Sequence, residues 1–148
     1  MRPFLAVTAG LLAGALVATS ALAQEMKPEE LLKARQGMME AVRMQLGPIF
    51  GAAKGAVPLP VAAQAADNVV GLAHALKTAY GNGDLPGSNA KPEAFTDAKF
   101  LAGYDKLADA AAKVAADAKG GNLDALKADV GAIGGACKAC HDDFRKKS

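Results

Sequence analysis

Two cysteines and a histidine lie close together near the end of the chain, in the stretch Cys137-Lys138-Ala139-Cys140-His141. Apolar residues around them recur at steps of three and four, the period of an α-helix with one buried face. These residues are Leu123, Leu126, Val130, Ile133, Cys137, Cys140 and Phe144. Two thiols one turn apart can each add across one vinyl group of the same porphyrin, and C-x-x-C-H is the attachment signature of c-type haem. His141 can then ligate the iron through Nε2.

Two other chemistries use cysteines at this spacing. A dithiol oxidoreductase carries C-x-x-C where a strand meets a helix in a βαβ unit, and no part of this sequence has a strand pattern. A structural zinc site requires about four ligands, and the only further histidine is His74. His74 stands two positions after Leu72, about 200° around a helix, so we expect it at the surface. The sequence therefore favours haem attachment.

Residues 1–23 have the composition of a secretory signal peptide. Arg2 gives a positive start, an apolar run extends to Val17, and Ala21-Leu22-Ala23 is an A-x-A cleavage site. The apolar run is short for a membrane span, so we expect cleavage, no membrane anchor and a periplasmic location. The remaining residues 24–148 suffice for one domain. They carry 16 basic and 15 acidic residues, a net charge near +1, which argues against nucleic-acid binding.

The mature chain divides into four helical patterns, which predict an all-α fold. The first opens at Pro28 and ends at Gly55, and we expect an interruption at Gly47-Pro48 because proline removes a backbone hydrogen bond. The others are expected from Pro60 to Gly81, from a cap at Thr96 to Gly120-Gly121, and from a cap at Asn122 to Phe144. Two connections are short, so neighbouring helices must be antiparallel, giving an up-down-up-down four-helix bundle with covalently bound haem. The long connection, residues 81–93, is expected to be mobile or to lie across one end of the bundle.

The predicted core is thinly filled by protein side chains. Alanine occupies many core-facing positions, tryptophan is absent and aromatic residues are few. A porphyrin would fill that space, so we expect the apoprotein to be poorly folded. Gly131, Gly134 and Gly135 lie inside the last helix, where each costs about 0.8–1 kcal/mol relative to alanine. Two explanations stay open, a close approach by the haem edge or another backbone, and conformational slack.

Several segments resemble one family. The C-terminal CKACHDDFRKK, the Ala34-Arg35-Gln36 of the first helix and its end at Ala53-Lys54-Gly55 are similar to cytochrome c prime and its low-spin relatives, the class II c-type cytochromes. The resemblance covers nearly the whole mature chain and implies the four-helix bundle. It also implies that Arg35 and Gln36 lie at the haem, and that the family often forms a homodimer through its first two helices.

The resemblance implies roles for the C-terminal motif. Cys137 and Cys140 match the attachment sites of one haem c, held through two thioethers, and His141 matches the proximal iron ligand. Phe144 and Arg145 match the family's proximal aromatic and basic pair.

The residue on the other face of the iron decides the function that the resemblance implies. In this family it lies four positions after the arginine of the Arg-Gln pair, which here is Met39. A thioether opposite histidine raises the reduction potential and suits a one-electron carrier that converts no substrate. A non-ligating residue leaves the iron five-coordinate and open to nitric oxide or carbon monoxide. His/Met electron transfer is our main prediction and gas binding the alternative; methionine also fills gaps in cores, and Met38 would ligate in a different register.

Cations flank the predicted site. Arg35 stands one turn before Met39 and is placed to donate to a haem propionate. The run Arg145-Lys146-Lys147, with Lys138, would form a basic patch that steers an acidic redox partner protein. The helix dipole alone also favours cations at a helix C-terminus. Both readings of the patch stay open.

Overall fold

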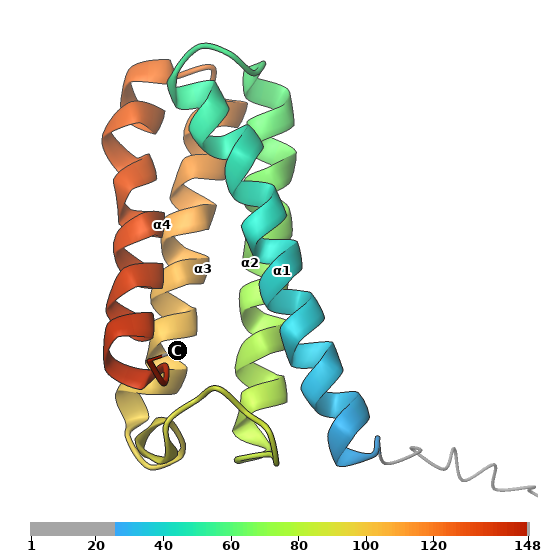
Figure 1. Cartoon of the computed structure of the whole chain (residues 1–148). Coiled ribbons are helices and arrows are strands. Elements are labelled where there is room, and N and C mark those ends of the chain that lie inside the picture. The colour runs from blue at the N-terminus through green and yellow to red at the C-terminus, as the bar shows by residue number, and fades with distance from the viewer. Residues whose placement is uncertain (1–25, 148) are drawn as a thin grey trace, which may run out of the picture.

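The computed structural model describes residues 26–147, and all regular elements of that range are helices. Four α-helices run α1 (Pro28–Ala53), α2 (Leu59–Gly81), α3 (Ala98–Lys119) and α4 (Leu123–Phe144), with a short 3₁₀ helix η1 (Pro92–Phe95) before α3. Successive helices point in opposite directions along one bundle (Figure 1). The predicted all-α, up-down-up-down four-helix bundle is therefore confirmed.

Local signals explain where α1 begins and ends, with one exception. Pro28 opens the helix, and the Glu30 carboxylate accepts a hydrogen bond from the Lys27 N–H at 3.1 Å. Gly55 has a φ of 74°, a conformation that favours glycine and stops the helix. The interruption predicted at Gly47-Pro48 is wrong, because α1 continues through Pro48. The carbonyl that loses its partner there belongs to Met44, which is exposed and can bond water.

The caps of α3 and α4 come from polar side chains. Asp97 caps α3 by accepting from the Lys99 N–H at 2.8 Å, so the cap predicted at Thr96 is one residue too early. Thr96 instead ends η1. Asn122 caps α4 as predicted, accepting from the Ala125 N–H at 3.0 Å.

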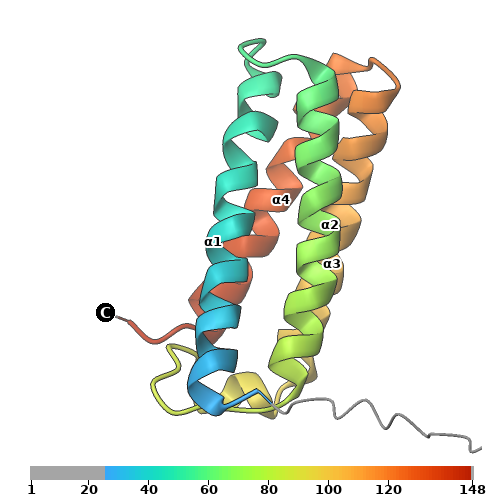
Figure 2. The ribbon, with the colours of Figure 1, turned by 90° about the vertical axis from the view of Figure 1, so that its right-hand side faces the viewer.

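The core lies along the bundle axis and is rich in alanine. Small side chains on α2 and α3 allow these two helices to pack closely, and they share the most extensive interface. By contrast, α1 packs mainly on α2, and α4 mainly on α3. Figure 2 shows α1 and α2 in front of α4 and α3. Of the four helix pairs that pack side by side, α1 and α4 form the smallest interface.

The long connection crosses the lower end of the bundle in Figure 1. We call residues 82–91 the strap. It is joined to the end of α4 by two backbone hydrogen bonds, from the Lys91 N–H to the Phe144 carbonyl at 2.8 Å and from the Lys146 N–H to the Asn89 carbonyl at 2.9 Å. The Lys91 ammonium also donates to the Asp143 carbonyl at 2.6 Å. Of the two predicted possibilities, the connection lies across the bundle end.

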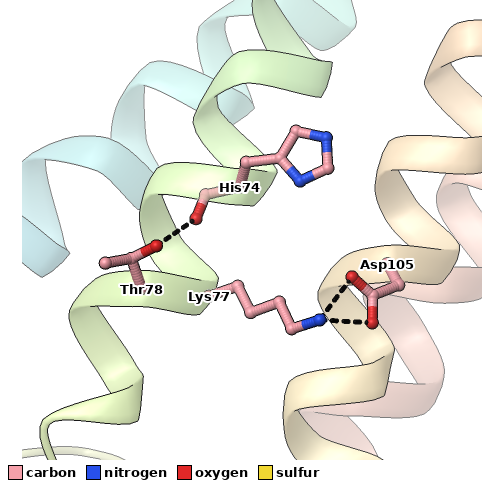
Figure 3. A network of polar contacts seen from close by, with 4 residues as sticks. All are labelled: His74, Lys77, Thr78 and Asp105. Atoms are coloured by element: carbon pink, nitrogen blue, oxygen red, sulfur yellow. Dashed lines mark hydrogen bonds and ion pairs between the residues drawn. The ribbon is translucent and has the colours of Figure 1, made fainter.

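Polar contacts, among them a half-buried ion pair, lie on the outer faces of α2 and α3. The Lys77 ammonium bonds both Asp105 carboxylate oxygens at 2.7 Å, and the His74 carbonyl accepts from the Thr78 hydroxyl (Figure 3). His74 is exposed, as its position relative to Leu72 predicted.

Across residues 26–147, none of the helices combines the length and apolar character that crossing a membrane requires. The predicted signal peptide, residues 1–23, lies outside the described range, so its cleavage stays a prediction.

Candidate haem site

A cavity of about 480 Å³ opens between α1 and α4, the neighbouring helices with the smallest interface. Its remaining walls are side chains of α3, the ring of Tyr80 from α2, and strap residues Ser88, Asn89 and Ala90. The volume falls within the range of about 300–1,000 Å³ that small-molecule and cofactor sites occupy. The lining is mostly apolar, with polar groups from α1, α4 and the strap.

The α4 wall carries the three residues of the attachment motif. Cys137, Cys140 and His141 all line the cavity, and both cysteines are half-buried thiols. Burial raises the pKa of Cys137, and burial followed by the Cys137 thiol raises the pKa of Cys140 to about 11, so both thiols are protonated at neutral pH. Burial, and then the Arg145 charge, lower the pKa of His141. This shift favours the neutral imidazole, the form that can ligate a metal.

The α1 wall places a thioether across the cavity from α4. Met39 and Gln36 line the cavity, whereas Met38 is half-buried outside it. The register that the sequence analysis favoured for Met39 is thus the one in which its side chain reaches the cavity.

Arg35 has different surroundings from those predicted. Its side chain is fully buried but does not line the cavity. Nη2 donates to the carbonyls of Ala79 and Gly83, both at 2.8 Å, and the guanidinium lies 4.5 Å from the Tyr80 ring centroid. Nε and Nη1 are buried without a partner, and burial lowers the pKa of the guanidinium. Arg35 therefore joins α1 to the C-terminal end of α2, and its contact with a propionate stays a prediction.

The residues that follow the motif also line the cavity. Phe144 is buried there, and Arg145 is exposed at its edge, pairing with Ala90 of the strap in an isolated antiparallel bridge. The basic patch predicted around Arg145 is partly neutralised, because Lys138 forms an ion pair with Asp142 one turn on.

Three features of the site carried no recognisable signal in the sequence. The Tyr104 hydroxyl is buried in the cavity wall without a hydrogen-bond partner. Ser88 is buried although it lies in a loop rich in glycine and proline. A Cβ added to Gly103 would lie 3.8 Å from the Cys140 sulfur, so α3 approaches the motif closely at this glycine.

The glycines that the sequence singled out in α4 have no such neighbours. No atom lies within 4 Å of a Cβ built on Gly131 or Gly135, and Gly134 meets only the Phe50 ring at 3.9 Å. The expected approach by another backbone is therefore not found at these three positions.

Residues 30–145 match the family described as Cytochrome C′. The chain belongs to the cytochrome c′ family. Cytochrome c′ of Rubrivivax gelatinosus is 37% identical over 130 residues, which cover 84% of this chain and all of that protein. Solved structures of the family have the same fold: for a ferrous variant of the Alcaligenes xylosoxidans protein with bound nitric oxide, the TM-score is 0.72 at 31% identity, covering 82% of this chain and 98% of that one.

A further variant of the Alcaligenes protein carries bound carbon monoxide and superposes with a TM-score of 0.72 at 33% identity, again over 82% of this chain and 98% of that one. All three relatives are cytochromes c′, and the two Alcaligenes structures hold nitric oxide and carbon monoxide, respectively. Between the two functions predicted from the sequence, the comparisons therefore favour gas binding over His/Met electron transfer.

The residues of this chain fit the haem c that the family binds. Two thiols and a neutral imidazole stand in one wall of an apolar cavity that no described side chain fills. Two buried polar groups near it, the Arg35 guanidinium and the Tyr104 hydroxyl, have unpartnered hydrogen-bond donors. Buried donors without a partner are rare in folded proteins. They are expected beside a site where a bound polar cofactor or its ligand accepts the missing hydrogen bonds.

Proposed function

We propose that this protein is an exported haem c protein that binds a small diatomic gas, nitric oxide or carbon monoxide, in the cavity between α1 and α4. The observation that carries the proposal is the composition of the two facing walls. The α4 wall offers Cys137, Cys140 and His141, whereas the α1 wall offers Met39 among apolar side chains, with Gln36, Glu40 and Arg43 beside them. An asymmetric site of this kind holds a metal firmly from one side and leaves the other side to an exogenous ligand.

Each residue of the motif has a separate task in this proposal. The Cys137 and Cys140 thiols would each add their S–H across one vinyl group of the porphyrin, so that two C–S bonds form and no oxidant is needed. His141 in its neutral form would ligate the iron through one ring nitrogen. When bound, the haem supplies an iron that binds diatomic gases and exchanges one electron.

A second function is supported by one residue of this chain. The Met39 thioether lines the wall opposite His141, and a methionine there is able to ligate the iron and produce a low-spin electron carrier. In the gas-binding protein, the same side chain is an apolar neighbour of the ligand. A redox partner protein and a homodimer belong to either version and stay predictions.

The absorption spectrum of the purified, reduced protein distinguishes the two functions. Gas binding predicts broad high-spin bands that shift when carbon monoxide is added. Sharp, resolved bands that carbon monoxide leaves unchanged would contradict it and support the His/Met carrier. In that case Met39→Ala should convert the sharp spectrum to the carbon monoxide-sensitive one, whereas the control Met38→Ala, one position round the helix, should not. Colourless protein that is compactly folded would refute both.

Periplasmic export is supported by the signal-like residues 1–23. It predicts that the mature protein begins at Gln24, which N-terminal sequencing of protein purified from the periplasmic fraction would test.

A further inference from the structure

The side chain of Tyr104 combines deep burial with an unsatisfied polar group. Only 4% of the residue is exposed, and its hydroxyl oxygen is buried with no hydrogen-bond partner. The ring lines the cavity and is held by a stacked contact with Tyr80, at 5.8 Å between centroids, and an edge contact with Phe100, at 5.6 Å. With the ring fixed on both sides, the hydroxyl cannot turn out to water.

This arrangement is unfavourable unless something bound in the cavity accepts a hydrogen bond from the Tyr104 hydroxyl. Buried hydroxyls in folded proteins nearly always have a partner, because an unsatisfied one loses its bonds to water without replacement. Burial also raises the pKa of Tyr104 well above its usual value, so the phenol keeps its proton and is a donor at every accessible pH. The missing partner must therefore be an acceptor.

The position of Tyr104 on α3 indicates which acceptor it meets. Its neighbour Gly103 faces the Cys140 sulfur, with 3.8 Å between that sulfur and a Cβ built on the glycine. The cysteines bond the vinyl groups of a porphyrin, and the porphyrin's carboxylates are carried on its other pyrrole rings. The side of the porphyrin that bonds Cys140 carries no carboxylate. The proposed gas-binding function supplies an acceptor at this place, the outer atom of a small ligand held in the cavity that Tyr104 lines.

We propose that the Tyr104 hydroxyl donates a hydrogen bond to the gas bound in this cavity and thereby affects which ligands the site retains. The inference rests on the proposed gas-binding function. A donor at this place stabilises ligands that gather negative charge on their outer atom, and it does so with little reorganisation because the ring is already fixed. Tyr104 is thus a specificity-determining residue, and Met39 and the other apolar neighbours provide no comparable donor.

The C–O stretching frequency of the ferrous carbon monoxide complex tests this directly. A hydrogen bond to the ligand oxygen lowers the frequency, so Tyr104→Phe should raise it and weaken carbon monoxide binding by about fivefold, the effect of one neutral hydrogen bond. Phenylalanine keeps the stacked ring, so a purely structural role for Tyr104 would leave the frequency unchanged. Tyr80→Phe is the matched variant, because Tyr80 is the only other tyrosine of the chain and also lines the cavity.

Each outcome decides the inference. A higher frequency in Tyr104→Phe supports it. An unchanged frequency in a variant that still binds carbon monoxide overturns it and leaves the proposed function intact, as does a shift produced by Tyr80→Phe alone. A protein that binds no carbon monoxide refutes both the proposed function and this inference. Should Tyr104→Phe fail to fold, the parent protein gives the answer: exchange into D₂O should shift the frequency if a hydroxyl proton bonds the ligand, and no shift overturns the inference.

Discussion

Replacing Arg35 with methionine tests whether the buried guanidinium meets an anion when haem is bound. Methionine keeps an unbranched side chain and removes the charge. The change deletes two hydrogen bonds of 2.8 Å, to the carbonyls of Ala79 and Gly83, and the cation above the Tyr80 ring. It also removes two buried donors, Nε and Nη1, that have no partner.

The two effects are of similar size. Hydrogen bonds from a charged donor contribute about 1.5–3 kcal/mol each, so the two together stabilise the fold by about 3–6 kcal/mol. Two unpartnered buried donors destabilise it by about 1–3 kcal/mol each, or about 2–6 kcal/mol. The centres of these two ranges nearly cancel, so without an anion the variant should have about the stability of the parent. If a haem carboxylate pairs with Arg35, the variant loses a buried charge pair and about 3–5 kcal/mol.

Urea unfolding of the haem-containing proteins measures this difference. We expect the larger loss, because two donors of a buried cation are otherwise unsatisfied. The control is Arg43→Met on the same helix, where an exposed arginine pairs with Glu40 and the change should be under about 1 kcal/mol. If Arg35→Met is as stable as the parent, Arg35 meets no carboxylate and only joins α1 to α2.

Three further predictions follow from the surroundings of the motif. Gly103→Ala should be tolerated, because its Cβ would lie at an ordinary contact distance, 3.8 Å, from the Cys140 sulfur. The larger side chain of Gly103→Leu should reduce the yield of covalently bound haem, which the mass of the purified chain measures. Equal yields in the two variants would contradict the close approach of α3 to Cys140. In the haem-free chain, kept folded by an osmolyte such as sucrose, Cys140 keeps its proton up to a pKa of about 11, above the value of about 8.5 for a free thiol. The contribution of the Cys140 thiol to stability is therefore complete below about pH 8.5 and should be lost as the pH rises toward 11. Urea unfolding midpoints measured across this pH range should fall. Midpoints that stay constant, or that fall equally in Cys140→Ser, would disprove the prediction. Lys91→Met removes the ammonium bonds to the end of α4 and should speed hydrogen exchange at the Lys146 amide while Lys147→Met does not.

The helices and the motif could be predicted from the sequence because the signals for them are local. Because Cys137 and Cys140 are three residues apart, their thiols share one face of any helix that contains them, independently of the rest of the fold. Pro28 and Asn122 mark where two helices begin. Pro28 has no N–H to leave unpaired in the first turn of α1, and the Asn122 side chain accepts a hydrogen bond in the first turn of α4. Short connections then leave few topologies for four helices. Even the errors at Thr96 and Gly47-Pro48 are local, and they moved no element.

The roles of Arg35, Tyr104 and the strap depended on tertiary structure. Periodicity placed Arg35 on the face of Met39, yet its guanidinium bonds carbonyls 44 and 48 residues further along the chain. Nothing around Tyr104 in sequence shows that its hydroxyl lacks a partner, because that depends on every side chain packed against it. The pairing of the strap with the end of α4 likewise joins segments separated by more than fifty residues. Sequence patterns report which face of an element is buried, whereas the partners that a buried polar atom meets are set only when distant elements pack together.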